Sequence, residues 1–182
     1  MLVTAVDHSG PIALRYPRGA GWGVALDAEP KHLEIGRAEL LRDGSDIVIA
    51  AIGQTVMPAL KAAQDLAPLG ISAAVVNSRF VKPLDKDLLR ALLPRVPRLI
   101  TVEDHVTAGG FGSAVIEFLA DDNISGVEIR RLGVPDRFIP HGTQDELRKM
   151  CGFDKDAIAQ AALQMVRRGK KKSREGWERG SA

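Results

Sequence analysis

The chain has 182 residues, of which 45% are hydrophobic, 26% are charged and only 4% are aromatic, with a net charge of +2. So few aromatic side chains argue against a stacking surface for single-stranded nucleic acid, and no apolar run is long enough to span a bilayer. A single cysteine, Cys151, excludes an internal disulfide and any multi-cysteine metal site. We expect one main domain of a soluble, cytoplasmic type, without a signal peptide.

The first 23 residues contain one strand pattern and no helix pattern of their own. The stretch "IALRYPRG", residues 12–19, begins with apolar residues and ends with Arg15 and Arg18. These two arginines either cap a solvated edge or hold an anion. A single strand is not stable alone, and the glycine-rich residues that follow are typical of a linker. Residues 1–23 are therefore interpreted as the end of a neighbouring domain, followed by a linker.

A regular unit is predicted from residue 33 to residue 166. Residues 33–44 indicate an additional strand, antiparallel at an edge. A continuous apolar run, typical of a strand covered on both faces, occupies residues 45–53, and residues 71–80 repeat this pattern. Residues 98–106 and 126–134 are predicted as the third and fourth strands. Helix patterns with caps and glycine stops occupy residues 54–70, 85–96, 109–122, 143–152 and 154–168.

Strand–helix alternation predicts an α/β fold with three layers. The sheet would be mostly parallel with helices on both of its faces, and it would have an antiparallel edge strand. The helix caps are expected at Thr55, Asp85 and Asp154, with a capping box between Thr143 and Glu146.

The chain ends in a basic segment, residues 167–182, with seven basic and two acidic residues. Such a segment could bind RNA or an acidic membrane. Because nothing beside it builds a groove, we interpret it as a disordered, solubilising tail.

Polar side chains follow three of the predicted parallel strands, where ligands of open α/β sheets bind. These polar residues are Asn77, Ser78 and Arg79 at the second strand, Glu103, Asp104 and His105 at the third, and Arg137 and His141 after the fourth. The fork of Arg79 suits a phosphate or a carboxylate, although an ion pair with Asp85 or another acid is the alternative.

Other features in this region favour a structural role. His105 could be a metal ligand or a general base, but such a histidine is more often structural or part of an interface. The turn with Gly109, Gly110 and Gly112 lacks a full phosphate-binding motif, which favours close backbone packing. Cys151, late in a helix, is interpreted as a small core residue.

Four motifs together resemble one known family. "ALRYPRG", "VVNSRFVKPLD", "ITVEDHVTAGGFGSAVIEFL" and "LGVPDRFIPHGTQDEL" are similar, in order and rough spacing, to the 1-deoxy-D-xylulose-5-phosphate synthases of the transketolase superfamily. The resemblance covers residues 10–166. It implies that residues 1–23 end the pyrimidine-binding domain and that residues 33–166 are the C-terminal domain.

The resemblance also implies an activity for the full-length enzyme. That enzyme condenses pyruvate with glyceraldehyde 3-phosphate, with loss of CO₂, for isoprenoid precursor, thiamine and pyridoxal phosphate synthesis. Thiamine diphosphate and Mg²⁺ would bind upstream, so we expect no cofactor, no metal and no catalytic residue in this fragment, which would be inactive alone. The implied partners are a second copy in a homodimer and the substrates, with no nucleic acid and no membrane.

For this fragment, the resemblance implies a phosphate-binding role for Arg15 and Arg79. Two guanidinium forks from different domains would fix the phosphate of glyceraldehyde 3-phosphate and so aim its aldehyde carbon. Arg18 would brace the turn after Pro17 or share this role. The alternatives are the C-terminal domain of another superfamily member, a transketolase or a 2-oxo acid dehydrogenase beta subunit, and a non-catalytic interaction domain.

Overall fold

The computed structural model describes residues 1–17, 19–23, 25 and 27–180, with side chains described as far as Gly169. Its strands are β1 (Glu39–Arg42), β2 (Ile47–Ala51), β3 (Ala73–Asn77), β4 (Arg98–Val106) and β5 (Glu128–Val134). Its α-helices are α1 (Leu2–Val6), α2 (Val56–Leu66), α3 (Lys86–Leu92), α4 (Phe111–Asp121), α5 (Gln144–Cys151) and α6 (Lys155–Gly180). Short 3₁₀ turns, η1 (Gly53–Thr55) and η2 (Ala67–Leu69), flank α2.

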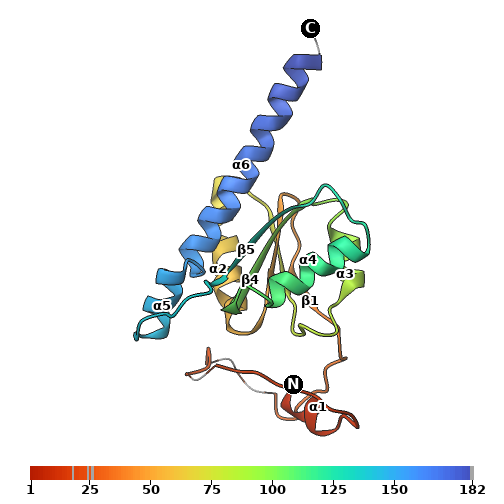
Figure 1. The fold of residues 1–182 in the computed structure, drawn as a ribbon, viewed down its shortest axis with the longest axis vertical. Helices are drawn as coiled ribbons and strands as arrows, with labels where there is room; N and C mark the ends of the chain where they lie inside the picture. Colours follow the sequence, from red (N-terminus) through yellow and green to blue (C-terminus); the bar gives the residue numbers. More distant parts are fainter. Residues whose placement is uncertain (18, 24, 26, 181–182) are drawn as a thin grey trace.

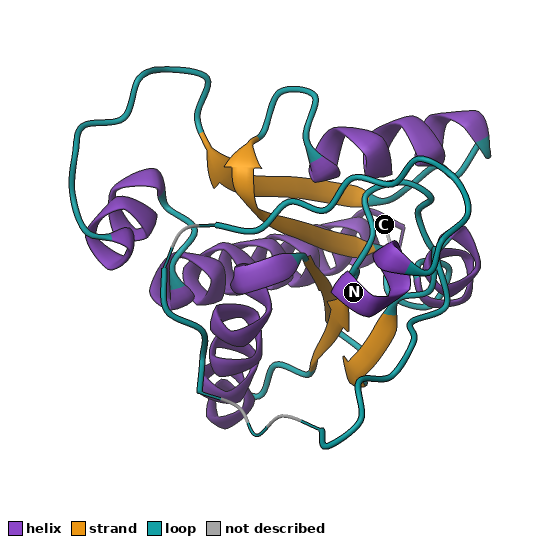
Figure 2. Ribbon diagram, turned by 90° about the horizontal axis from the view of Figure 1, so that it is seen from below, coloured by secondary structure: helices purple, strands orange, loops and turns teal. Residues whose placement is uncertain are grey.

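The five strands form one sheet in the order β1-β3-β2-β4-β5. Four of them are parallel, and β1 runs antiparallel to β3 at the edge. Helices cover both faces of this sheet, as Figures 1 and 2 show. The predicted fold class, including its antiparallel edge strand, is confirmed.

The two faces of the sheet bury two separate hydrophobic clusters. Every residue of β2 is buried, and alternate residues point to opposite faces because side chains alternate along a strand. Ile47 and Ile49 belong to the cluster that includes α2 and α6, whereas Val48 and Ala50 belong to the cluster of α3 and α4. This double burial explains why the sequence of β2 is a continuous apolar run, whereas the edge strands β1 and β5 are largely exposed or half-buried.

Three of the predicted helix caps are confirmed. The Asp85 carboxylate accepts the Leu88 N–H at 3.0 Å, and Asp154 accepts the Ala157 N–H at 2.9 Å. The capping box of Thr143 and Glu146 is complete. These bonds satisfy backbone donors that helix beginnings otherwise leave without a partner.

The cap predicted at Thr55 is different. Thr55 is the first residue before α2, but its hydroxyl bonds the Val102 carbonyl at 2.9 Å and accepts the Ile52 N–H at 3.2 Å. It therefore ties the turn after β2 to β4 instead of capping the helix. Thr55 is fully buried beside the point where the strand order reverses, and there tertiary contacts outweigh the local preference.

The strand predicted within residues 12–19 is wrong. In the described part of this stretch the backbone forms no strand, and Ile12 and Tyr16 are exposed. An isolated strand has no neighbour to accept its backbone hydrogen bonds, so its apolar pattern alone cannot order it. Residues 11–17 instead lie in a loop that runs past the carboxyl ends of the parallel strands (Figure 1). The short helix α1 before them, Leu2–Val6, was not predicted.

Two of the domain assignments stay predictions. One is the division into residues 1–23 and 33–166. The other is the disordered tail over residues 167–182. The backbone of α6 continues to Gly180. The side chains after Gly169 and the whole of residues 181–182 lie outside the described residues. Within the described range, no helix is both long and apolar enough to cross a membrane.

Candidate functional site

The sheet reverses its strand order between β2 and β4. After β2 the chain turns to α2 on one face, and after β4 it turns to α4 on the other face. Loops that leave neighbouring parallel strands in opposite directions open a crevice beyond their carboxyl ends, which is where open α/β sheets bind ligands. The side chains at this crevice define the candidate site.

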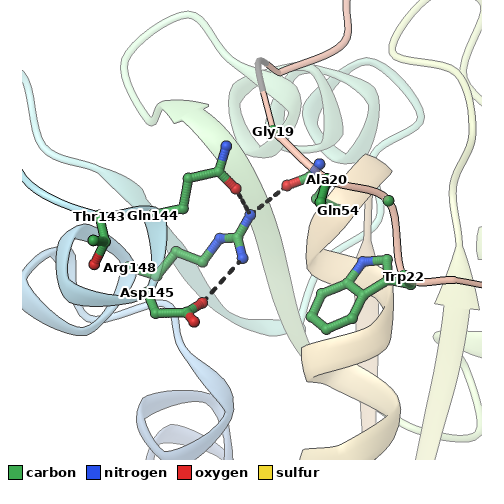
Figure 3. Close-up of a pocket in the computed structure, with 9 residues that line it drawn as sticks. Gly19, Ala20, Trp22, Gln54, Thr143, Gln144, Asp145 and Arg148 are labelled. Atoms are coloured by element: carbon green, nitrogen blue, oxygen red, sulfur yellow. Dashed lines mark hydrogen bonds and ion pairs between the residues drawn. The ribbon is translucent and has the colours of Figure 1, made fainter.

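Arg148 of α5 lies at the centre of the crevice and is 7% exposed. Its Nη2 donates to Oε1 of Gln54, which follows β2, and to Oε1 of Gln144 at 2.9 Å (Figure 3). Carboxylate oxygens of Asp104 in β4 and Asp145 lie at 3.8 and 3.6 Å from its guanidinium nitrogens. A buried guanidinium is costly unless it is paired, and here it has partners from β4, α5 and the turn after β2.

Two hollows adjoin Arg148. The larger hollow, about 520 Å³, lies between Gln54, the start of α5 and residues 19–22 of the amino-terminal segment. The smaller hollow, about 330 Å³, is lined by Arg15 and Pro17 from the same segment together with Asp104, Arg148 and Cys151. The amino-terminal segment thus forms one wall of both hollows.

The amino-terminal segment contacts the sheet domain at defined points. Nζ of Lys61, in α2, lies 5.2 Å from the ring centroid of Trp22, which is a cation–π distance. The Leu33 N–H donates to the hydroxyl of Thr4 at 2.9 Å, and Thr4 is the buried residue of α1. These contacts hold the segment across the carboxyl end of the sheet.

Arg15 and Arg79 both lie at the carboxyl end of the sheet but in different places. Arg15 is exposed and lines the smaller hollow, beside the ends of β4 and β5. Arg79 follows β3, on the far side of β2, and lines neither hollow. Arg15 and Arg148 therefore line the same hollow, whereas Arg79 follows a strand that β2 separates from β4 in the sheet.

Arg79 has a distinctive local geometry. Its φ angle is 54°, in the left-handed region that side chains other than glycine rarely adopt. The Phe80 N–H bonds the Ser78 carbonyl across it at 2.5 Å, and both of these neighbours are buried. Arg79 is therefore the apex of a tight turn at the end of β3, with its side chain 24% exposed.

Arg79 makes an ion pair with Glu39 of β1, with Nη2 at 2.5 Å from Oε2. The sequence analysis offered such a pair, with Asp85 or another acid, as the alternative to phosphate binding. Asp85 itself is occupied elsewhere, because it caps α3 and accepts the Ala38 N–H at 2.9 Å. The structure therefore shows an ion pair with another acid, and the phosphate role stays a prediction.

Glu103 and the glycine turn have a structural arrangement. The Glu103 carboxylate is fully buried and accepts the Phe111 N–H at 2.6 Å and the Gly112 N–H at 2.9 Å, at the start of α4. A side chain at Gly110 would meet Glu103 Oε2 at 2.1 Å, and one at Gly112 would meet the Thr101 hydroxyl at 2.6 Å. The packing role predicted for these two glycines is confirmed by these contacts.

The other candidate residues do not converge on one centre. His105 is partly exposed and bonds the Val106 carbonyl at 3.0 Å through Nδ1. Arg137 and His141 are exposed on the loop between β5 and α5, and Cys151 is half-buried beside the smaller hollow. Arg18 lies outside the described residues.

The described residues do not fit a metal or a diphosphate cofactor. They contain no group of three or more His, Cys, Asp or Glu side chains that could hold a metal ion. The glycine turn is filled by the Glu103 carboxylate, whose charge would repel a diphosphate. What the carboxyl end of the sheet offers chemically is a set of guanidinium groups that suit an anion.

The sequence analysis missed Arg148 and Gln54. Arg148 was read only as part of a capped helix, because an arginine in an amphipathic helix usually lies on its solvated face. Two signals could have found it. Arg148 follows Gln144 by one helical turn, and Leu147 and Cys151 bracket it on the side that faces the core.

Comparison with known proteins identifies the class of domain. The family model of the transketolase C-terminal domain matches residues 36–158. The chain belongs to this family. In solved structures it resembles the inactive beta4 tetramer of a split-gene transketolase, with a TM-score of 0.69, 32% identity, and coverage of 75% of this chain and 44% of that one.

The curated relatives are more specific. The chain is 53% identical over 161 residues to 1-deoxy-D-xylulose-5-phosphate synthase 1 of Geobacter sulfurreducens, which covers 88% of this chain and 25% of that protein. It is 47% identical over 166 residues to the 1-deoxy-D-xylulose-5-phosphate synthase of Halothermothrix orenii, which covers 91% and 26%. The chain therefore spans about a quarter of the length of these relatives, as the resemblance of the four motifs predicted.

Proposed function

We propose that the chain is the C-terminal part of a 1-deoxy-D-xylulose-5-phosphate synthase. The enzyme would condense pyruvate and glyceraldehyde 3-phosphate, with loss of CO₂, in isoprenoid precursor, thiamine and pyridoxal phosphate synthesis. The identity of about half of all aligned residues to synthases of this name carries the proposal. The full enzyme would act as a cytoplasmic homodimer.

Within that enzyme, this part would anchor the acceptor substrate and supply dimer surface. Thiamine diphosphate and Mg²⁺ would be held by the rest of the enzyme, where the cofactor would provide the carbanion chemistry. The described residues contribute no metal cluster to that chemistry, and the part alone would be inactive. The role left to its own side chains is to bind and orient.

Arg79 would bind the phosphate of glyceraldehyde 3-phosphate together with Arg15. The left-handed backbone of Arg79 supports this role, because strained conformations of non-glycine residues concentrate at functional sites. Both arginines lie at the end of the sheet where ligands of this fold class bind. A separation of a few strand spacings would allow the two long side chains to reach one dianion from opposite sides, as bidentate forks do.

Kinetics of the complete enzyme test this role. Arg79→Ala should raise the KM for glyceraldehyde 3-phosphate far more than the KM for pyruvate. The loss of a charge-assisted contact should cost about 2–4 kcal/mol of binding free energy. Arg95→Ala is the matched control, because Arg95 makes a similar exposed ion pair with Asp43 at the opposite end of the sheet. An equal rise in both constants would instead assign Arg79 to fold support.

The part alone offers a second test. Mixed with pyruvate, glyceraldehyde 3-phosphate, thiamine diphosphate and Mg²⁺, it should form no product, and product should appear when the remaining domains are added. Turnover by the part alone would contradict the proposed division of roles.

A further inference from the structure

Glu39 is the one side chain that contacts the Arg79 guanidinium among the described residues. The two residues come from different strands. Glu39 is the first residue of β1 and is paired in register with Asn77, two residues before Arg79. The antiparallel edge strand therefore delivers a carboxylate to the turn at the end of β3, where no local sequence feature would place one.

The contact between them is single rather than bidentate. Oε2 of Glu39 accepts from Nη2 of Arg79. A guanidinium has five N–H donors, so four remain for another acceptor. No other hydrogen bond joins these donors to a described residue, so a phosphate that reaches them would leave the hydrogen bond to Glu39 in place.

The exposure of the pair also favours a positioning role over a stabilising one. The Glu39 side chain is 45% exposed and that of Arg79 is 24% exposed. Ion pairs between such exposed groups contribute little to stability because water and salt screen them. A single strong hydrogen bond nevertheless restricts the rotamers of a long side chain that would otherwise lose that freedom when the ligand binds.

We propose that Glu39 is the positioning residue of Arg79, holding one edge of its guanidinium so that the remaining donors face the phosphate of the acceptor. This inference rests on the proposed function, because it takes Arg79 to be a phosphate ligand. The backbone and the side chain of Arg79 are then fixed by different means. The tight turn between Ser78 and Phe80 fixes the Cα position, and Glu39 fixes the fork.

Two substitutions of Glu39 separate its hydrogen bond from its charge. Glu39→Gln and Glu39→Ala both remove the negative charge, but only glutamine keeps an oxygen that can accept from Arg79. Their affinities for glycerol 3-phosphate, an unreactive probe, are measured by isotope-edited NMR titration of this chain at fixed ionic strength. Glu39→Gln should bind about fivefold more tightly than Glu39→Ala, the factor that a typical hydrogen bond contributes.

Matched variants at a remote ion pair control for general electrostatic effects. Asp43 pairs with Arg95 at 2.7 Å, and both side chains are more exposed than those of Glu39 and Arg79. Asp43→Asn and Asp43→Ala should bind the probe as the unmodified chain does. Thermal unfolding of each variant checks that the fold is intact.

The result for Arg79→Ala distinguishes the two proposals. If Arg79→Ala loses affinity for the probe while Glu39→Gln and Glu39→Ala bind equally, Glu39 has no positioning role and the phosphate assignment stands. If Arg79→Ala binds as tightly as the unmodified chain, the phosphate does not bind Arg79, and both proposals are overturned.

Discussion

Two arginines at the carboxyl end of one sheet have opposite environments. Arg148, at the switch between β2 and β4, is buried and contacts polar groups from three elements. Arg79, at the end of β3, lies on a left-handed turn with one acidic partner. In the first arrangement Nη2 of the guanidinium joins two parts of the fold by hydrogen bonds, and Nε is buried without a partner among the described residues. In the second, one hydrogen bond holds Nη2 and the side chain is partly exposed. Substitutions can test whether Arg148 stabilises the fold and Arg79 binds a ligand.

The largest expected effect is on stability at Arg148. Arg148→Ala should lower the free energy of unfolding by about 3 kcal/mol, because it removes a buried side chain and leaves its half-buried acceptors Gln54 and Gln144 without their charged donor. Urea denaturation of this chain measures it. Arg148→Lys should recover only part of the loss, since an ammonium cannot reproduce a planar fork. A loss below about 1 kcal/mol would show that Arg148 is not a structural centre.

Removing one acceptor of Arg148 should have a smaller effect. Gln54→Ala should lower the free energy of unfolding by about 1.5 kcal/mol, the usual contribution of a hydrogen bond to a charged group. Gln144 also accepts from the same Nη2, so the guanidinium keeps a partner. The effects of Gln54→Ala and Arg148→Ala should not add in the double variant, and full additivity would contradict a shared network.

At Arg79 the comparison is between two replacements that both remove the side chain. Arg79→Gly should be about 1 kcal/mol more stable than Arg79→Ala, because glycine adopts positive φ without the steric cost that alanine has. Both should lose affinity for glycerol 3-phosphate to the same degree. Equal stability of the two variants would show that the turn carries no strain, and the functional argument from its backbone would fail.

The smallest effect concerns the start of α5. The Thr143 hydroxyl and N–H donate to Glu146 at 2.7 and 3.0 Å and hold the pKa of that carboxyl below its ordinary 4.5. A carboxyl whose pKa is lower in the folded state stabilises the fold above its unfolded pKa, and this stabilisation is lost as the pH falls through the folded pKa.

Glu146→Gln should therefore reduce the decline in stability on acidification below about pH 4.5. Unfolding by urea at a series of pH values for both proteins measures this difference. Because Thr143 and Asp145 also line the larger hollow, the same series shows whether acid loosens the start of α5 next to Arg148. An identical pH dependence of the two proteins would show that the capping box does not contribute.

Much of the fold could be predicted because its signals are local. The continuous apolar run of β2, the Asp85 cap of α3 and the capping box before α5 each result from interactions within a few residues or from burial on both faces. The prediction of a strand within residues 12–19 was wrong because a local signal is not sufficient for a strand. Its apolar pattern was genuine, but a strand needs a neighbour, and the sequence cannot show whether one is present.

The site was predictable only in part. Arg15 and Arg79 stood out because short motifs around them resemble a known family, although their phosphate role remains a prediction. No family motif pointed to Arg148, Gln54 or Glu39, because the contacts between Arg148 and Gln54 and between Glu39 and Arg79 join residues 94 and 40 positions apart. Pairings of that kind depend on strand order, which follows from how the whole sheet packs.

The sequence by itself determined the layers of the fold, the caps of three of its helices and the family to which the chain belongs, since hydrophobic periodicity, caps and motifs are read residue by residue. Only the tertiary structure decided which arginine is buried, which acid meets Arg79 and where the strand order reverses. Those outcomes depend on long-range contacts, whose free energy comes from bringing distant segments together out of water.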